Sequence, residues 1–187
     1  MSTREVPQDR NLADLAAGYL DDPGPGPLRA LQDWLIAFDV TQLDIPALFR
    51  TLEHPHSDSW AVEPLLDARP AAVRLFALPA RSYMPLHDHP GMTVLMRVVA
   101  GQARITSWTR IDRATVARHG DRVVDAGSEV QVTEPLQGNV HDIRPLNDFA
   151  FIDLLIPPYA PENGRPCTFY RGQPTGAPSR LRLIATE

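Results

Sequence analysis

The sequence predicts a mainly β protein, a sandwich or barrel of short strands with two or three helices at its N-terminal end. From about Val73 onward, short runs rich in Val, Ile and Leu alternate with turn residues, which is the pattern of an all-β domain. The 19 prolines occur at about twice the average frequency and are spread along the chain, which suits many short elements joined by turns. Because the chain has 187 residues, 43% of them hydrophobic, we expect one buried core and a single domain.

Two helices are predicted before the strands. Residues 11–21 place apolar side chains at helical spacing behind Asn11, a residue type that caps helix N-termini well. Alternating proline and glycine over residues 23–27 ends this helix, and Pro27 suits the first turn of a second one. We expect the helices to pack on the strands, because about 65 residues with few large apolar side chains would be only marginally stable alone.

Several segments after residue 70 have strand character, because each is short, rich in aliphatic residues and bounded by turn signals. These segments are residues 74–78, 93–99, 103–109, 129–133, 139–144, 149–156 and 181–185. We therefore expect a helical extension over residues 1–70, packed on a β-barrel over residues 71–187, with both parts in a single domain.

Charge and cysteine content narrow the classes of protein. The net charge is -5 and every basic residue is arginine, so no lysine patch is available to follow a phosphate backbone and no nucleic-acid partner is expected. The single Cys167 cannot form an internal disulfide, and the first residues are polar, which favours a cytoplasmic protein. Apolar runs are too short to span a membrane, so no membrane partner is expected. A monomer is one interpretation of the oligomeric state, which the sequence leaves open.

Three histidines form the clearest candidate for a chemical site. His87 and His89 are two residues apart, and in an extended strand such side chains project to the same face. His141 lies in another predicted strand, so three neutral nitrogen ligands from two strands could converge on one ion. A closed structural zinc site would want a fourth protein ligand, usually cysteine, and Cys167 lies far along the chain in a loop-like segment. An open, catalytic metal site is therefore the better interpretation.

The histidines lie within a longer set of linked motifs, which extends over about residues 80–171. The motifs are Met84-Pro85-Leu86-His87-Asp88-His89-Pro90-Gly91-Met92, then Gly138-Asn139-Val140-His141, then Phe151-Ile152-Asp153 with Pro157-Pro158-Tyr159, and finally Gly164-Arg165-Pro166-Cys167 with Phe169-Tyr170-Arg171. The order of these motifs, and approximately the spacing between them, resemble those of the cysteamine dioxygenase and plant cysteine oxidase family of thiol dioxygenases.

The resemblance implies a cupin-type double-stranded β-barrel in which His87, His89 and His141 hold a non-haem Fe(II). The general cupin pattern places a glutamate ligand where this chain has Val94, so the fourth ligand is missing, as expected of a three-histidine thiol dioxygenase. Three neutral histidines leave the full charge of the ion available to capture an anionic thiolate, and O2 would then add to the sulfur to give a sulfinic acid. Zinc could bind the same histidines, but it has no redox chemistry.

Asp153 and Tyr159 are the remaining candidate catalytic residues. Asp153 interrupts an otherwise apolar strand, where a carboxylate needs a partner; it is either structural or, as the resemblance implies, orients a ligand or a substrate amine. If the loop over residues 144–148 joined the two flanking strands as a hairpin, its length would decide whether Asp153 faces His141. The resemblance puts Tyr159 near the mouth of the pocket, within reach of substrate or oxygen. The resemblance also aligns Cys167 with a cysteine that some relatives link to a tyrosine two residues later; here that residue is Phe169.

The substrate is expected to be an aminothiol without a free carboxylate. Strand alternation sends Arg97 outward, while Arg81 and Arg104 stay open as clamps for a carboxylate. We therefore favour cysteamine or an N-terminal cysteine over free cysteine. Two alternatives stay open: a metal-binding cupin that acts as a small-ligand sensor or accessory module without turnover, and a metal-dependent lyase or isomerase. His54, His56 and His119 are interpreted as loop residues.

Overall fold

A computed structural model describes residues 7–52, 59–177 and 179–186. Three helices come first along the chain: α1 (Pro7–Asp21), α2 (Pro25–Ala37) and α3 (Ile45–Arg50). The strands follow, and they are β1 (Ala61–Ala68), β2 (Ala71–Leu78), β3 (Met84–Asp88), β4 (Thr93–Ala100), β5 (Gln102–Arg110), β6 (Thr115–Asp125), β7 (Gln131–Thr133), β8 (Val140–Pro145), β9 (Phe149–Ile156), β10 (Phe169–Pro174) and β11 (Arg180–Ala185). A short 3₁₀ helix, Pro161–Asn163, lies between β9 and β10.

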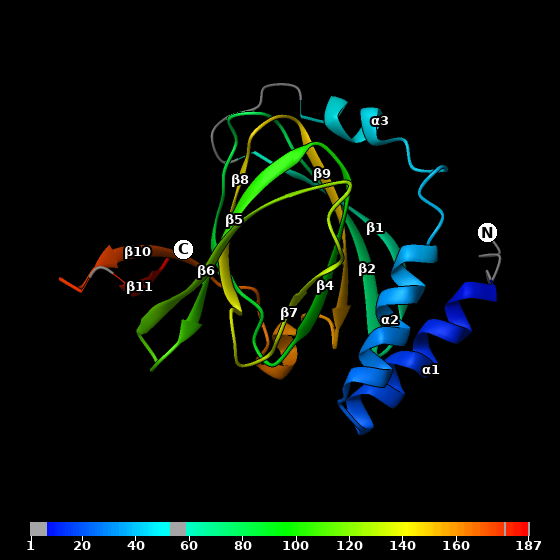
Figure 1. The fold of residues 1–187 in the computed structure, drawn as a ribbon, viewed down its shortest axis with the longest axis horizontal. Helices are drawn as coiled ribbons and strands as arrows, with labels where there is room; N and C mark the ends of the chain where they lie inside the picture. The colour runs from blue at the N-terminus through cyan, green and yellow to red at the C-terminus, as the bar shows by residue number, and fades with distance from the viewer. Residues whose placement is uncertain (1–6, 53–58, 178, 187) are drawn as a thin grey trace.

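The strands form two sheets. One has the order β1-β2-β9-β4-β7, and the other closes on itself in the order β10-β11-β6-β5-β8-β3 (Figure 1). Between the sheets lies an apolar core to which β2, β4 and β9 contribute from one side and β3, β5, β6 and β8 from the other. Its largest fully buried side chains include Phe149 and Phe151. This arrangement confirms the mainly β, double-stranded barrel that the sequence predicts.

Helices α1 and α2 cover the outer face of the first sheet, as predicted (Figure 1). Leu12, Leu31 and Leu35 are fully buried there, and each such side chain contributes about 1.5–3 kcal/mol of burial free energy. Arg97 of β4 points to the same side and donates from Nη1 to the backbone oxygens of Leu35 and Phe38, 2.9 Å from each. The predicted outward direction of Arg97 is thus observed, and its partners are at the end of α2.

β3 lies outside the predicted aliphatic segments and is expected only from the spacing of His87 and His89, and three further strands are not predicted at all. β1 precedes Val73 and is mostly exposed, with a register shift after Pro64; it is an edge strand, so no apolar alternation marks it. β6 buries few side chains, and His119 lies within this strand rather than in a loop. β10 likewise has no fully buried residue. Strands with little buried surface carry little hydrophobic signal, and for this reason pattern analysis misses them.

The segment between β8 and β9 is not a hairpin, contrary to the pairing considered from the sequence. β8 pairs with β3 and β5 in the closed sheet, whereas β9 pairs with β2 and β4 in the other. Asn147 and Asp148 in this segment accept hydrogen bonds from the backbone N–H groups of Gln102 and Ala80, which fixes the crossing between sheets. The direction of Asp153 is therefore set by the stacking of two sheets and not by a loop length.

None of the helices described is both long and apolar enough to cross a membrane. His54 and His56, interpreted as loop residues, lie outside the described residues.

Candidate metal centre

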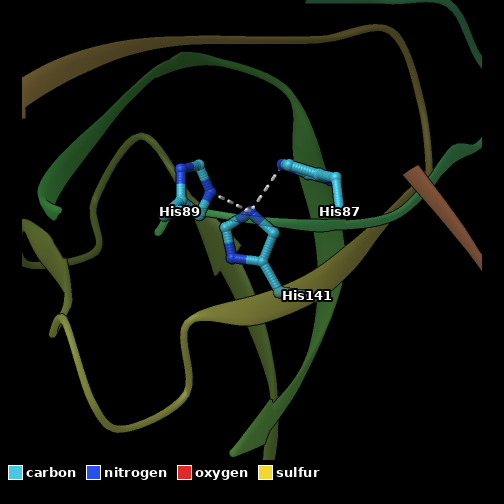
Figure 2. Close-up of side chains that lie close together, drawn as sticks. All are labelled: His87, His89 and His141. Carbon is cyan, nitrogen blue, oxygen red and sulfur yellow. Dashed lines mark hydrogen bonds between the residues drawn. The ribbon is translucent and has the colours of Figure 1, made fainter. Parts of the chain in front are cut away.

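Strand pairing brings the three predicted histidines together. His87 on β3 lies directly opposite His141 on β8, and His89 follows the end of β3. The side chains converge from these two strands, as Figure 2 shows. Nε2 of His141 lies 3.1 Å from Nε2 of His87 and 3.2 Å from Nε2 of His89. All three side chains are buried.

This spacing fits ligands of one metal ion. Nitrogen ligands about 2.1 Å from an ion and at right angles to each other lie about 3.0 Å apart. Ligand atoms from the three residues lie within 4.8 Å of one another. Burial lowers the pKa of His87, and burial together with the neighbouring histidines lowers the pKa of His89 and His141 further. The imidazoles are therefore neutral, which is the form that coordinates a metal.

Hydrogen bonds on the outer ring nitrogens orient two of these histidines. Nδ1 of His87 donates to the backbone oxygen of Pro85 at 2.9 Å. The hydroxyl of Tyr159 donates to the backbone oxygen of Asp88 at 2.9 Å and lies 2.6 Å from Nδ1 of His89, from which it can accept. Both contacts suit the tautomer with the proton on Nδ1, which leaves the Nε2 lone pair for an ion.

Asp88 points away from the histidines and anchors them to β10 and β5. Its carboxylate accepts from the hydroxyl of Tyr170 at 2.7 Å, from Nη2 of Arg110 at 3.0 Å and from the backbone N–H of Thr168 at 3.0 Å. The side chain of Asp88 is only 10% exposed, so these charge-assisted bonds satisfy a carboxylate that would be costly to bury alone.

The histidines form part of the wall of a cavity of about 380 Å³. The remaining wall is mostly apolar and comes from both sheets and from the segment after β9. It includes Trp60, Val62, Phe76, Met84, Ile143, Phe151, Leu155, Pro158, Tyr159, Cys167 and Phe169, together with Arg74 and Asp153. A small molecule that contacts the histidines would therefore be largely shielded from water.

Asp153 faces this cavity from the middle of β9. It lies opposite Met96 on one neighbouring strand and Arg74 on the other. Its side chain is buried, and Oδ1 has no hydrogen-bond partner within the described part of the chain. Burial raises the pKa of Asp153 well above its ordinary value. A buried polar atom without a partner at a cavity wall is suited to receive a donor from a ligand.

Tyr159 and Cys167 both line the cavity. Burial raises the pKa of the Cys167 thiol to about 11, which keeps it protonated. Phe169, at the position where some relatives have a tyrosine, lies opposite His87 with ring centroids 5.6 Å apart. Tyr170 points to the other side, toward Asp88, and does not take the place of the missing phenol.

The structure also settles where the candidate arginines lie. Arg104 pairs with Asp121 and is half-exposed, and Arg81 is exposed in the turn between β2 and β3. Neither residue lines the cavity, but Arg74 does. Arg74 is not among the residues predicted for the site, although its signal in the sequence is the same as that of Asp153: one charged residue within an otherwise apolar strand.

Comparison with known proteins adds a family match. Residues 50–186 match the family model described as PCO_ADO. A protein of Dictyostelium discoideum named probable 2-aminoethanethiol dioxygenase is 32% identical over 117 residues, which cover 58% of this chain and 54% of that protein. The 2-aminoethanethiol dioxygenase of Mus musculus is 31% identical, with 52% of this chain and 48% of the relative covered. Plant cysteine oxidase 1 of Arabidopsis thaliana is 30% identical, with 53% and 37% covered.

The chain spans about half or less of the length of these relatives. Among solved structures, a protein with a double-stranded beta-helix domain from Klebsiella pneumoniae aligns with a TM-score of 0.47 and 15% identity, over 66% of this chain and 90% of that one.

Proposed function

Because the chain belongs to the PCO_ADO family, we propose that it is a non-haem Fe(II) thiol dioxygenase. The reaction adds both atoms of O2 to the sulfur of an aminothiol, so that the thiol becomes a sulfinic acid while O2 is fully reduced. The favoured substrates are cysteamine or an N-terminal cysteine rather than free cysteine. The observation that carries the proposal is the convergence of His87, His89 and His141, all neutral, at the wall of a largely apolar cavity.

Within this proposal, the three histidines hold the iron through Nε2. When bound, the iron supplies a positive charge that attracts thiolate and the redox chemistry with O2 that zinc lacks. No fourth protein ligand is brought to the histidines within the described residues, and Val94 occupies the position of the usual cupin glutamate. Such a set leaves room for substrate and oxygen together, which turns their encounter into a local reaction.

Asp153 is proposed to receive the amine of the substrate. Its partnerless oxygen can accept a hydrogen bond from an ammonium group, and the positive charge of that group would favour the ionised carboxylate that burial disfavours. An aminothiol therefore provides both a sulfur for the metal and a cation for Asp153.

Tyr159 is proposed to act beside the metal, because its hydroxyl contacts His89 and its ring forms part of the cavity wall. It keeps the Nδ1 proton of His89 in place and leaves the opposite nitrogen as a ligand. The aromatic and aliphatic wall excludes water from the sulfur during oxidation.

Oxygen uptake by anaerobically reconstituted Fe(II) protein tests the proposed function. The protein is offered cysteamine, cysteine, 3-mercaptopropionate and a peptide with an N-terminal cysteine. The products are then examined by mass spectrometry for two added oxygen atoms. We expect uptake and a sulfinic product with cysteamine or the peptide, and loss of both in His87→Ala. Absence of uptake with every thiol, in protein shown to hold iron, would overturn the proposal and favour a ligand-sensing cupin.

The proposal includes a cytoplasmic location, which rests on the single cysteine and its consequent lack of internal disulfides. It also names a small aminothiol and O2 as the partners.

A further inference from the structure

We propose that Arg74 is a specificity-determining residue that donates hydrogen bonds to an acyl oxygen next to the aminothiol group. The cavity would then distinguish an N-terminal cysteine, which carries a carbonyl on the same carbon as its amine, from cysteamine, which has none. This inference rests on the proposed thiol dioxygenase function and deepens it.

The position of Arg74 supports this role. It lies on β2 directly opposite Asp153 on β9, and both side chains line the cavity. Residues directly opposite in an antiparallel pair have their Cβ atoms about 4.5–5.5 Å apart on the same face. A strong donor and a strong acceptor thus start from neighbouring positions in an apolar wall, with the guanidinium turned toward β1 by its bonds to Leu66 and Asp67. An N-terminal cysteine carries its carbonyl and its amine on one carbon, so the carbonyl would face Arg74 when the amine faces Asp153.

Hydrogen bonds hold the guanidinium of Arg74 in place but leave some of its N–H groups without an acceptor among the described residues. Nη1 donates to the backbone oxygens of Leu66 and Val73 at 3.1 and 3.0 Å, and Nη2 donates to Oδ1 of Asp67 at 2.5 Å. A guanidinium has five N–H groups. Two of them therefore have no acceptor among the described residues, and the side chain is only 24% exposed. A fixed donor with unused N–H groups binds an oxygen at little further entropic cost.

The charge on Arg74 indicates which oxygen it prefers. Asp67 neutralises the guanidinium from the outer side, where its own side chain is 67% exposed. The ion pair as a whole is neutral, so a second carboxylate would compete with Asp67, whereas a neutral carbonyl only needs a free N–H group. This preference agrees with an N-terminal cysteine, whose carbonyl belongs to an amide, over free cysteine.

Substitution of Arg74 by methionine tests the inference. The variant removes every donor but keeps an unbranched side chain. We compare the ratio of kcat/KM for cysteinamide, which carries the amide carbonyl, to that for cysteamine, which lacks it. Loss of a hydrogen bond from a charged donor should lower this ratio roughly tenfold, mainly through KM. Anaerobic calorimetric titration of the Fe(II) protein should show the same change in the ratio of Kd values, without any turnover.

Arg97→Met is the matched control. Arg97 also donates to backbone carbonyls, but from the outer face of the same sheet, so this variant should keep the wild-type ratio. Asp67→Asn supplies a second test on an exposed side chain. It removes the competing carboxylate, so kcat/KM for free cysteine should rise severalfold relative to cysteinamide.

The outcomes separate the two proposals. If the wild-type protein oxidises no thiol, the proposed function fails. If it oxidises thiols and Arg74→Met keeps the wild-type ratios of kcat/KM and Kd, the role of Arg74 is disproved. A uniform loss with all substrates would assign Arg74 a structural role and also overturn the inference. Should Arg74→Met not fold, the Asp67→Asn result decides: an unchanged preference between cysteine and cysteinamide contradicts the inference.

Discussion

The hydroxyl of Tyr159 lies 2.6 Å from Nδ1 of His89, although the two residues are 70 positions apart in the sequence. The same hydroxyl donates to the backbone oxygen of Asp88. One side chain therefore holds both the ring and the backbone of the His87–His89 segment. This relationship links the segment after β9 to the candidate metal ligands and leads to the first prediction.

Tyr159→Phe should weaken metal binding while it keeps the aromatic wall of the cavity. The variant loses the acceptor for the Nδ1 proton of His89, and loss of such an outer contact lowers metal affinity about 10- to 100-fold. Anaerobic competition with a chelator measures the Fe(II) dissociation constant. Tyr83→Phe, outside the cavity, serves as the control. Equal dissociation constants for wild type and Tyr159→Phe would contradict the positioning role.

Arg110→Met should destabilise the protein and loosen the metal site. It removes the ion pair to the carboxylate of Asp88, which is 10% exposed, and leaves only two hydrogen bonds to that charge. We expect about 1–3 kcal/mol lower free energy of unfolding in urea and weaker Fe(II) binding. Arg104→Met breaks an exposed ion pair and should change stability by less than about 1 kcal/mol. A stability loss as small as that control would show that Asp88 does not depend on Arg110.

Asp153→Asn should change how stability depends on pH in the metal-free protein. Burial raises the pKa of Asp153 in the folded state, so above the ordinary value of 3.8 the folded protein holds a proton that the unfolded chain has released. The free energy of unfolding therefore falls as pH rises from 3.8 toward the raised pKa, and this loss should vanish in Asp153→Asn. Urea unfolding at a series of pH values measures it. Parallel profiles for the two proteins would show that Asp153 is not buried as described.

The three histidines should make the metal-free protein less stable as pH falls, whereas Asp153 should make it less stable as pH rises. Burial lowers their pKa values in the folded state, so below 6.5 the unfolded chain takes up protons that the folded protein does not. The metal-free protein should therefore lose stability as pH falls below 6.5, by up to about 1.4 kcal/mol per pH unit for each histidine. His141→Leu should remove the contribution of one histidine to this slope, which is up to about 1.4 kcal/mol per pH unit. A slope that the substitution leaves unchanged would mean that His141 titrates normally in the folded protein.

Local patterns in the sequence were sufficient to predict several features of this protein. The helical spacing after Asn11 predicts α1, and the Pro-Gly run marks its end, but the helix begins four residues earlier, at Pro7, so the prediction that Asn11 caps it is wrong. Aliphatic runs predict most of the buried strands, and β9 over residues 149–156 is the clearest of them. His87, near the end of β3, and His89, just after it, converge as the alternation of side chains in an extended segment predicts. These features depend on neighbours along the chain, and for this reason the sequence alone determines them.

Only the tertiary structure decided which distant residues meet. Asp153 and Arg74 face the same cavity because β9 pairs with β2 in a sheet opposite that of His141, and not because a hairpin joins β8 to β9. Tyr159 reaches His89 only because the segment after β9 returns beside the end of β3. Such contacts depend on which strands pair and how two sheets stack. Exposed strands such as β1 and β6 carry little apolar periodicity, so neither their pairing nor their presence can be derived from local pattern.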